Sequence, residues 1–252
     1  MVSKLVRVDE ELRRAAEKAL VELVRIEHEF DRSSITLPIW MSSGSAVIVS
    51  ITRDRAGFMV SDAGETYIEA EDIGAQQSFS KQAKKFADEL GIQYADKRLS
   101  LSGVSAENLA GAISCVAEAI KSAYDAASTR TTEARDKRMG EVFYEKLVRI
   151  FDPRHVVKDM AIRGASNHEW HFSNVVTLHD QRTIFEPVSG APNSVFSVFS
   201  KFQDVKQLIK PPARVSVISD REEIGDYIAL LAQASSVIEA EASDVTVRQL
   251  VA

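Results

Sequence analysis

The chain of 252 residues has a single cysteine, and this scarcity excludes an internal disulfide framework and any cysteine-rich zinc site. Cys115 lies in the apolar helical stretch AGAISCVAEAI, where we expect it to pack as a small buried side chain. No segment approaches the roughly 18 uncharged apolar residues that a membrane-spanning helix needs. The N-terminus also lacks the long apolar stretch of a signal peptide. We therefore expect a cytoplasmic protein that makes no contact with a membrane.

The chain also lacks a strongly basic or strongly acidic half. Its net charge is −6, from 31 Lys and Arg against 37 Asp and Glu. Residues 1–130 carry 16 and 20 of these, and the remainder carries 15 and 17. Nucleic-acid binding therefore cannot rest on bulk charge, and the acidity is too modest for a DNA mimic. The basic stretches at 81–85 and 135–138 are short, so we expect mainly solvated helix faces there, with phosphate contacts as the alternative.

Residues 1–130 show the pattern of a small α+β domain. Apolar residues at three- and four-residue spacing predict a helix from Asp9 to near Phe30. Three stretches rich in β-branched and aromatic residues then predict strands, followed by two helices, a small hairpin and a third helix after Ser105. The strands are expected at 35–41, 45–53 and 57–62, the helices at 66–74 and 79–91, and the hairpin at 93–103. Residues 127–138 are polar and form the best candidate linker, although they contain no Gly or Pro and could join two helices.

Residues 131–252 show a different order of elements. An amphipathic helix precedes three consecutive strands, and a helix, a strand, a helix, a short strand and a last helix follow. The strands are expected at 155–164, 168–178, 182–189, 213–220 and 237–242, and the later helices at 194–209, 222–234 and 243–252. Hairpin-linked strands followed by helix-linked strands indicate a mixed sheet with helices on both faces.

This second order resembles the core of the restriction-endonuclease-like superfamily. Active members place an acidic residue on the second strand, and a Glu or Asp, one spacer and a Lys on the third. Such chemistry needs two carboxylates that hold a divalent metal such as Mg²⁺ or Mn²⁺, and a lysine that steadies the developing charge. Here the second strand offers Ser173 and Asn174, and the third offers Glu186, Pro187 and Val188. Only Glu186 matches, so the resemblance implies a degenerate domain.

An alternative keeps a catalytic site. Glu169 and His171 share one face of the second strand, and Glu186 lies on the third. If the register brings Glu169 or His171 beside Glu186, that residue and Glu186 could form the site of a divergent metal-dependent nuclease, with Glu186 and His171 as candidate metal ligands.

The motif Ser61-Asp62-Ala63-Gly64-Glu65 stands where a strand passes into a helix. Backbone amides at such a transition can bind an anion. The competing interpretation is that Asp62 closes the turn while Gly64 adopts a positive φ, and we favour it. Near the helix at 194–209, Asn193 or Ser194 is expected to act as a cap rather than as a nucleophile.

The whole chain is similar to a family of uncharacterised two-domain proteins of prophages and mobile elements. The residues that carry the similarity are 45–50 (SAVIVS), 57–65 (GFMVSDAGE) and the histidine-containing strand at 168–172. The family pairs an N-terminal domain of unknown function with a nuclease-like domain. The resemblance implies a role in conflict between mobile elements and their hosts.

Together these observations favour a non-catalytic interaction protein that acts in host defence or counter-defence, without a cofactor. Its partner would be a protein or a nucleic acid. The boundary between the domains is expected at residues 130/131. The apolar stripes at 9–30 and 105–150 further predict a homodimer formed by helix packing.

Overall fold

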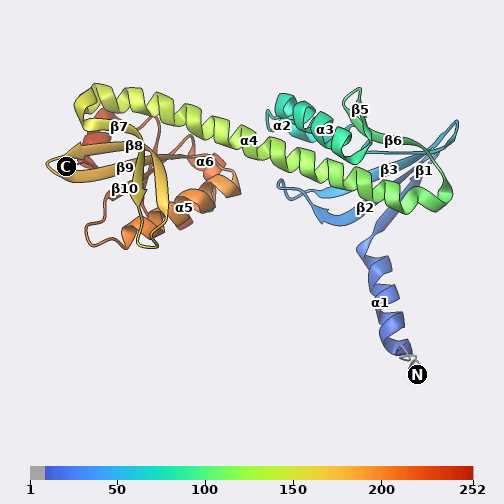
Figure 1. Cartoon of the computed structure of the whole chain (residues 1–252). Coiled ribbons are helices and arrows are strands. Elements are labelled where there is room, and N and C mark those ends of the chain that lie inside the picture. The colour runs from blue at the N-terminus through green and yellow to red at the C-terminus, as the bar shows by residue number, and fades with distance from the viewer. Residues whose placement is uncertain (1–8, 252) are drawn as a thin grey trace, which may run out of the picture. The chain divides into compact units, whose positions relative to one another are not determined.

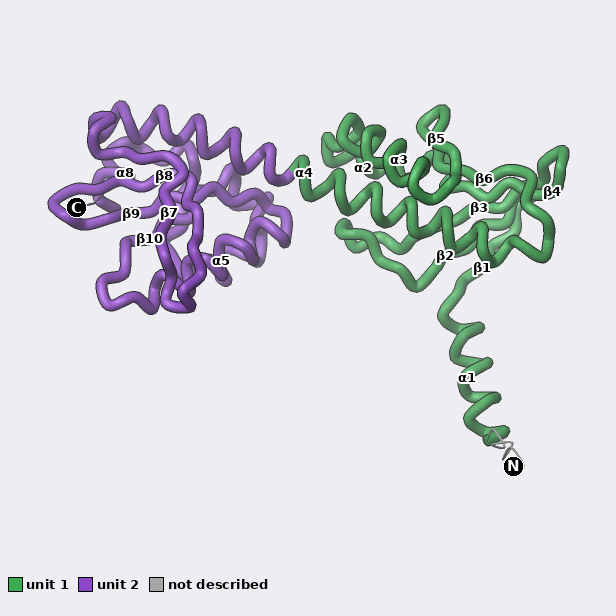
Figure 2. Tube along the Cα trace, in the orientation of Figure 1, with its two compact units in different colours: residues 1–131 green, residues 132–252 purple. Residues whose placement is uncertain are grey.

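The computed structural model describes residues 9–251 and divides the chain into two compact units, Met1–Thr131 (unit 1) and Thr132–Ala252 (unit 2) (Figure 2). Unit 1 is an α+β structure and unit 2 is a mixed sheet with helices on both faces, which confirms the predicted fold class. No helix within residues 9–251 is both long and apolar enough to cross a membrane.

Unit 1 is built on a six-stranded sheet with the order β1-β2-β3-β4-β6-β5, in which every neighbouring pair is antiparallel (Figure 1). One face of the sheet is covered by helices, and its core joins Val49 and Val60 to Phe79 and Ile120. The opposite face is open, and Ile48 on it is 47% exposed. The elements are α1 (Glu10–Leu23), β1 (Arg25–Glu29), β2 (Arg32–Trp40), β3 (Ala46–Asp54), β4 (Gly57–Ser61), α2 (Glu65–Asp72), α3 (Gln76–Leu90), β5 (Gln93–Ala95), β6 (Arg98–Val104), the 3-10 helix η1 (Ala106–Asn108) and the first part of α4 (Leu109–Phe151).

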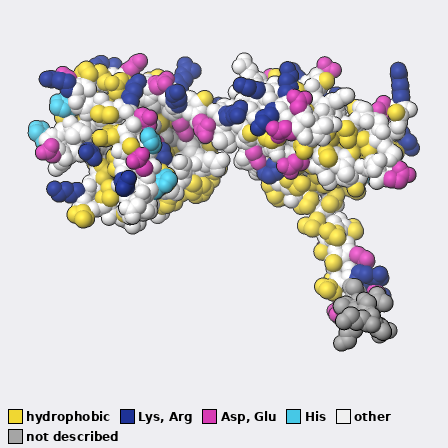
Figure 3. Space-filling view, viewed as in Figure 1, with side chains coloured by type: hydrophobic (Ala, Val, Ile, Leu, Met, Phe, Trp, Pro, Cys, Tyr) yellow, Lys and Arg dark blue, Asp and Glu magenta, His cyan; other side chains and the backbone are white. Residues whose placement is uncertain are grey.

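The first helix is shorter than the sequence pattern predicts. Helix α1 ends at Leu23, and the next residues form β1, which pairs with β2 through contacts such as Ile26 with Ile35. Strand pairing satisfies the backbone groups of these residues and outweighs the helical spacing of Ile26. No residue of α1 is buried, and Leu12 and Leu20 are 65% and 63% exposed. Figure 3 shows the hydrophobic side chains of this helix on the surface.

The prediction of a linker at residues 127–138 is wrong. These residues lie inside the 43-residue helix α4 and do not interrupt it. The absence of Gly and Pro leaves helix-forming Ala, Arg, Glu and Lys residues there, so nothing interrupts the helix. The apolar stripe of α4 packs within the chain itself. Val116 and Ile120 belong to the core of unit 1, and Phe143 and Leu147 belong to the core of unit 2. This stripe is therefore not a free dimer surface.

Unit 2 is built on a five-stranded sheet with the order β11-β10-β9-β8-β7. β7, β8 and β9 are antiparallel neighbours, and β9, β10 and β11 are parallel neighbours. Helix α5 connects β9 to β10, so helix, three-strand meander, helix and parallel strand follow one another in the order that the sequence predicts. The elements after α4 are the 3-10 helix η2 (Pro153–His155), β7 (Val156–Arg163), β8 (Glu169–Leu178), β9 (Gln181–Val188), α5 (Pro192–Lys206), β10 (Ala213–Ile218), α6 (Arg221–Ile224), α7 (Tyr227–Ala232), β11 (Ser236–Glu239) and α8 (Asp244–Gln249).

Each face of this sheet has its own core. Phe172 and Ile184 pack with Phe202 of α5 on one face. Val176 and Phe185 pack with the second part of α4 on the other. The predicted helix at 222–234 is two short helices, because Gly225 adopts φ +55° between them. This positive φ, which glycine adopts readily, ends α6.

The sheet forks between β8 and β9. Their pairing runs from Leu178 opposite Gln181 to Asn174 opposite Phe185 and ends there. Beyond that point β9 pairs with β10, and the beginning of β8 pairs with β7. Pro187 has no N–H to donate, which suits a strand segment that has lost one neighbour. Glu186 is therefore the first residue of β9 after the fork.

Candidate functional site

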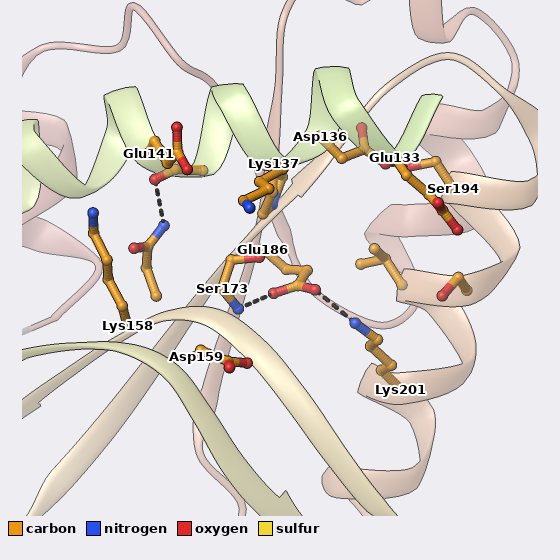
Figure 4. A pocket seen from close by; sticks show the side chains of 15 residues that line it. Glu133, Asp136, Lys137, Glu141, Lys158, Asp159, Ser173, Glu186, Ser194 and Lys201 are labelled. Carbon is orange, nitrogen blue, oxygen red and sulfur yellow. Dashed lines mark hydrogen bonds and ion pairs between the residues drawn. The ribbon is translucent and has the colours of Figure 1, made fainter. Parts of the chain in front are cut away.

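A cavity of about 480 Å³ lies at this fork (Figure 4). Its walls come from α4, β7, β8, β9 and α5, all within unit 2. We refer to it as the fork cavity. The residues that line it are Glu133, Asp136, Lys137, Gly140, Glu141, Lys158, Asp159, Ser173, Asn174, Glu186, Pro187, Ser194, Ser197, Val198 and Lys201.

Glu186 is the centre of the site, and its side chain is held by two donors. Its carboxylate Oε1 lies 2.8 Å from Nζ of Lys201, and Oε2 accepts a hydrogen bond of 2.7 Å from the backbone N–H of Ser173 (Figure 4). Lys201 also donates to the backbone carbonyl of His171. The side chain of Glu186 is 6% exposed and that of Lys201 is 20% exposed, so this ion pair is largely shielded from water. A buried carboxylate of this kind needs a paired cation.

Sequence reasoning missed Lys201, because the lysine was sought on the third strand, where Val188 stands. Lys201 comes instead from α5, three residues after Val198 and four before Val205, both of which are buried. A charged residue within an apolar helical stripe was the available signal, since such a residue faces the sheet and needs a partner there.

The structure does not bring Glu169 or His171 into the fork cavity. Glu169 lies opposite Arg163, at the end of β8 that pairs only with β7, and it is exposed. The side chain of His171 is 60% exposed, and its Nδ1 lies 3.0 Å from Asp159 Oδ1. His171 contacts two residues of the lining from outside the cavity: its imidazole lies beside Asp159, and its backbone carbonyl accepts a hydrogen bond from Lys201. Of the three candidate site residues, Glu186 alone lines the cavity.

Asp136 of α4 forms a second polar cluster in the wall. Its carboxylate accepts hydrogen bonds from the backbone N–H of Ser189 at 2.9 Å and from Oγ of Ser194 at 2.6 Å. Burial raises the pKa of Asp136, while these hydrogen bonds and the charge of Lys201 act in the opposite direction. The expected capping role of Asn193 or Ser194 is wrong. The N-cap of α5 is Ala191, and Ser194 turns to Asp136 instead.

The lining carries five carboxylates and three lysines, a formal charge of −2. The residues present do not fit a divalent metal. Within residues 9–251, no three His, Cys, Asp or Glu side chains converge closely enough to hold an ion. Beside Glu186, β8 carries Ser173 and Asn174 and no carboxylate. Ser173 donates its backbone N–H to Glu186, and the amide of Asn174 donates to the carbonyl of Gly140. Lys201 supplies beside Glu186 the positive charge that a metal would supply.

In unit 1, the turn at Asp62 is closed by the protein itself. Oδ1 of Asp62 accepts hydrogen bonds of 3.0 Å from the backbone N–H groups of Gly64 and Leu99. Gly64 adopts φ +84°, as the turn interpretation requires. Asp62 is 2% exposed, and burial raises its pKa against the effect of these hydrogen bonds. The carboxylate therefore occupies the place that an anion would need.

Comparison with known proteins leaves the family open. No family model and no curated protein sequence matches the chain. Among solved structures, the chain is similar to Can2 from Sulfobacillus thermosulfidooxidans, determined in complex with cyclic tetra-adenylate. The identity is 11% and the TM-score is 0.33, and the match covers 77% of this chain and 56% of Can2. The chain thus spans little more than half the length of that protein, and a likeness of this size assigns neither a fold nor a function.

Proposed function

We propose that unit 2 is a non-catalytic domain with a nuclease-like fold that binds nucleic acid at the fork cavity. The observation that carries the proposal is the pairing of Glu186 with Lys201 and with the backbone N–H of Ser173. Both oxygens of the carboxylate at the nuclease position already have partners from the chain.

The environment of Glu186 favours binding over cleavage. A cleaving site needs a second carboxylate beside the first so that the two can hold a metal ion. Ser173 stands at that position and donates its backbone N–H to the carboxylate of Glu186. A backbone N–H cannot act as a metal ligand. Because Lys201 already neutralises Glu186, the site attracts a cation less strongly than a free carboxylate would.

Lysines at the cavity favour a nucleic acid as the ligand. Lys137, Lys158 and Lys201 line it from three different elements, α4, β7 and α5. The ammonium group of Lys158 lies 4.1 Å from the ring centroid of Tyr144, which restrains it at the wall. Because five carboxylates also line the cavity, phosphate contacts are confined to the lysines. Binding should therefore be moderate, with a measurable salt slope that corresponds to only a few phosphate contacts.

Fluorescence anisotropy with labelled single-stranded DNA, duplex DNA and single-stranded RNA tests the proposal. The variant Lys137→Gln/Lys158→Gln should bind about tenfold more weakly than the wild type, and the slope of log affinity against log salt should fall by roughly 0.7–0.9 per lysine lost. Lys81→Gln/Lys84→Gln in unit 1 is the matched control, because it removes the same charge from exposed positions. Equal losses in both double variants, or no binding to any of the three probes, would contradict the proposal.

A divergent metal-dependent nuclease is the second candidate, and one observation favours it. Lys201 faces Glu186, so the lysine that such chemistry requires is present at the site although it comes from α5. Cleavage that requires Mg²⁺ or Mn²⁺ and is lost in Glu186→Gln would establish this candidate.

The proposal extends to a role in conflict between mobile elements and hosts, in defence or counter-defence. The similarity of residues 45–50, 57–65 and 168–172 to the two-domain prophage family supports it. Affinity capture of the tagged chain from host cells during phage infection, with and without nuclease treatment of the lysate, tests the role. Partners that survive the treatment would show that a protein, rather than nucleic acid, is recognised.

A further inference from the structure

A second cavity lies at the opposite end of β9 from the fork. Its volume is about 750 Å³, and it is formed where β9 and β10 begin and where α5 has ended. We call it the basal cavity. The residues that line it are Ile162, Asp180, Gln181, Arg182, Thr183, Leu208, Lys210, Pro211, Pro212, Ala213, Arg214, Leu250 and Val251. None of them lines the fork cavity.

The two cavities differ in the sign of their charge. Three cations, Arg182, Lys210 and Arg214, face a single carboxylate, Asp180, so the lining of the basal cavity has a formal charge of +2. The lining of the fork cavity has −2. Within residues 9–251, none of the three cations forms an ion pair with an Asp or Glu side chain. Positive charge gathered in a concave site attracts anions.

Arg214 is the fixed cation of this cavity. Its Nε donates to the carbonyl of Ala234 at 2.8 Å, and its Nη1 donates to the carbonyl of Pro212 at 2.7 Å. These bonds hold the guanidinium group in place and use two of its five N–H donors. Burial lowers the pKa of Arg214, as expected for a cation removed from water without a carboxylate beside it. A bound anion would supply the missing opposite charge.

The remaining wall is mixed. Gln181 and Thr183 contribute polar groups, and the apolar residues are Ile162, Leu208, Pro211, Pro212, Ala213, Leu250 and Val251. A concave site of several hundred Å³ that combines apolar surface with fixed polar groups can hold a small organic ligand. The combination fits a molecule with an anionic group at one end and a flat, weakly polar body at the other.

We propose that the basal cavity binds a nucleoside monophosphate, with the phosphate held by Arg182, Lys210 and Arg214 and the base against the Pro211–Pro212 wall. Arginine is well suited to the phosphate, because its planar group can donate two parallel hydrogen bonds. The site is separate from the fork cavity and does not depend on nucleic-acid binding there.

Isothermal titration calorimetry of the full chain with AMP, GMP, CMP and UMP tests the proposal, with adenosine and inorganic phosphate as comparison ligands. At least one nucleotide should bind about tenfold or more tightly than either comparison ligand, because only the nucleotide makes both sets of contacts. The double variant Arg182→Gln/Lys210→Gln should weaken that binding by about tenfold to a hundredfold. Both side chains are exposed, so the variant should keep the fold, which its thermal melting curve checks.

The fork variant Lys137→Gln/Lys158→Gln is the matched control and should bind the nucleotide as the wild type does. Conversely, Arg182→Gln/Lys210→Gln should leave oligonucleotide binding at the fork cavity unchanged, so the two sites can fail separately. The proposal is overturned if none of the four nucleotides binds at millimolar concentration. It is also overturned if adenosine binds as tightly as AMP, or if the basal double variant retains full affinity.

Discussion

Two buried carboxylates, Asp62 in unit 1 and Glu186 in unit 2, show how differently the two halves of the chain use the same group. Asp62 is 2% exposed and Glu186 is 5% exposed. Oδ1 of Asp62 is held by two backbone N–H groups, from Gly64 and Leu99. Glu186 is held by one backbone N–H and by the side chain of Lys201.

The two carboxylates have different hydrogen-bond partners because they lie at different places in their sheets. Asp62 follows β4 inside a continuous antiparallel sheet, and it ties the β4–α2 turn to β6. Glu186 lies where β8 and β9 separate and a cavity opens. A backbone donor is fixed by the fold, whereas a lysine side chain can move when a ligand arrives. Burial alone therefore does not mark a functional carboxylate, and the nature of its partner is more informative.

The largest expected effect comes from removing the partner of Glu186. Lys201→Met should destabilise unit 2 by about 3 kcal/mol, because a buried carboxylate is left without a cation. Adding Glu186→Gln should recover much of this loss, which gives a coupling energy of about 2 kcal/mol between the two positions.

Urea unfolding can isolate this effect, because the chain has two tryptophans and each unit holds one of them. In a Trp40→Phe background, Trp170 reports on unit 2 alone. It is partly buried, and its Nε1 donates to Asp204. Additive losses in the double variant would show that Glu186 and Lys201 are not coupled.

A smaller effect is expected at Asp62. Asp62→Ala should cost about 1–3 kcal/mol, because the N–H groups of Gly64 and Leu99 lose their acceptor. Asp62→Asn keeps that acceptor and removes the buried charge, so it should change stability by less than about 1 kcal/mol at neutral pH. Chemical unfolding of both variants would measure the difference. Equal losses in the two would contradict the turn-closing role of Oδ1.

The raised pKa of Asp62 also makes the free energy of unfolding depend on pH. Between the ordinary pKa of the carboxyl group and its raised folded value, the folded state binds more protons than the unfolded state. The contribution of Asp62 to stability should therefore fall as pH rises through this window and level off above it. Asp62→Asn should lack this component. A wild-type contribution that rises with pH in the same window would contradict the assignment.

Asp136 should produce a still smaller effect, and on binding rather than on folding. Because burial raises its pKa, Asp136 takes up a proton at a higher pH than an exposed carboxyl group does. Protonation makes the lining of the fork cavity less negative, so oligonucleotide affinity should rise by a few fold as pH falls towards the folded pKa. In Asp136→Asn this dependence should be reduced, as anisotropy over a pH series at constant salt would show. If the pH dependence of oligonucleotide affinity is unchanged in Asp136→Asn, another group causes it.

The smallest effect concerns α1, whose stripe was predicted to form a homodimer. A helix of 14 residues with no buried residue is marginal by itself. Its amides should exchange with deuterium much faster than those of α4 at low protein concentration. If the chain self-associates through Leu12 and Leu20, protection should increase with concentration, and Leu12→Glu/Leu20→Glu should abolish the increase. Light scattering would report the mass directly, and a monomer at all concentrations would refute the dimer.

The order of elements in unit 2 and the position of Glu186 could be predicted from sequence, because they depend on local periodicity and on residues close together in the chain. The partners of both buried carboxylates could not. Leu99 is 37 residues from Asp62, and Lys201 is 15 residues from Glu186, so both contacts depend on how elements pack. The same holds for β1, where pairing with β2 replaces the predicted end of a helix. Pro187 lies just beyond the point where β8 and β9 separate. It was a local signal of that separation, but it could be interpreted only once the pairing of the two strands was known.

Binding of nucleic acid at the fork cavity without cleavage can be tested directly. The most direct measurement incubates labelled single-stranded DNA, duplex DNA and RNA with the wild type and with Glu186→Gln, each with Mg²⁺ or Mn²⁺. The products are resolved on a denaturing gel, and binding is followed in parallel. We expect intact substrate in every lane, together with salt-sensitive binding by the wild type. Cleavage by the wild type that Glu186→Gln abolishes would contradict it.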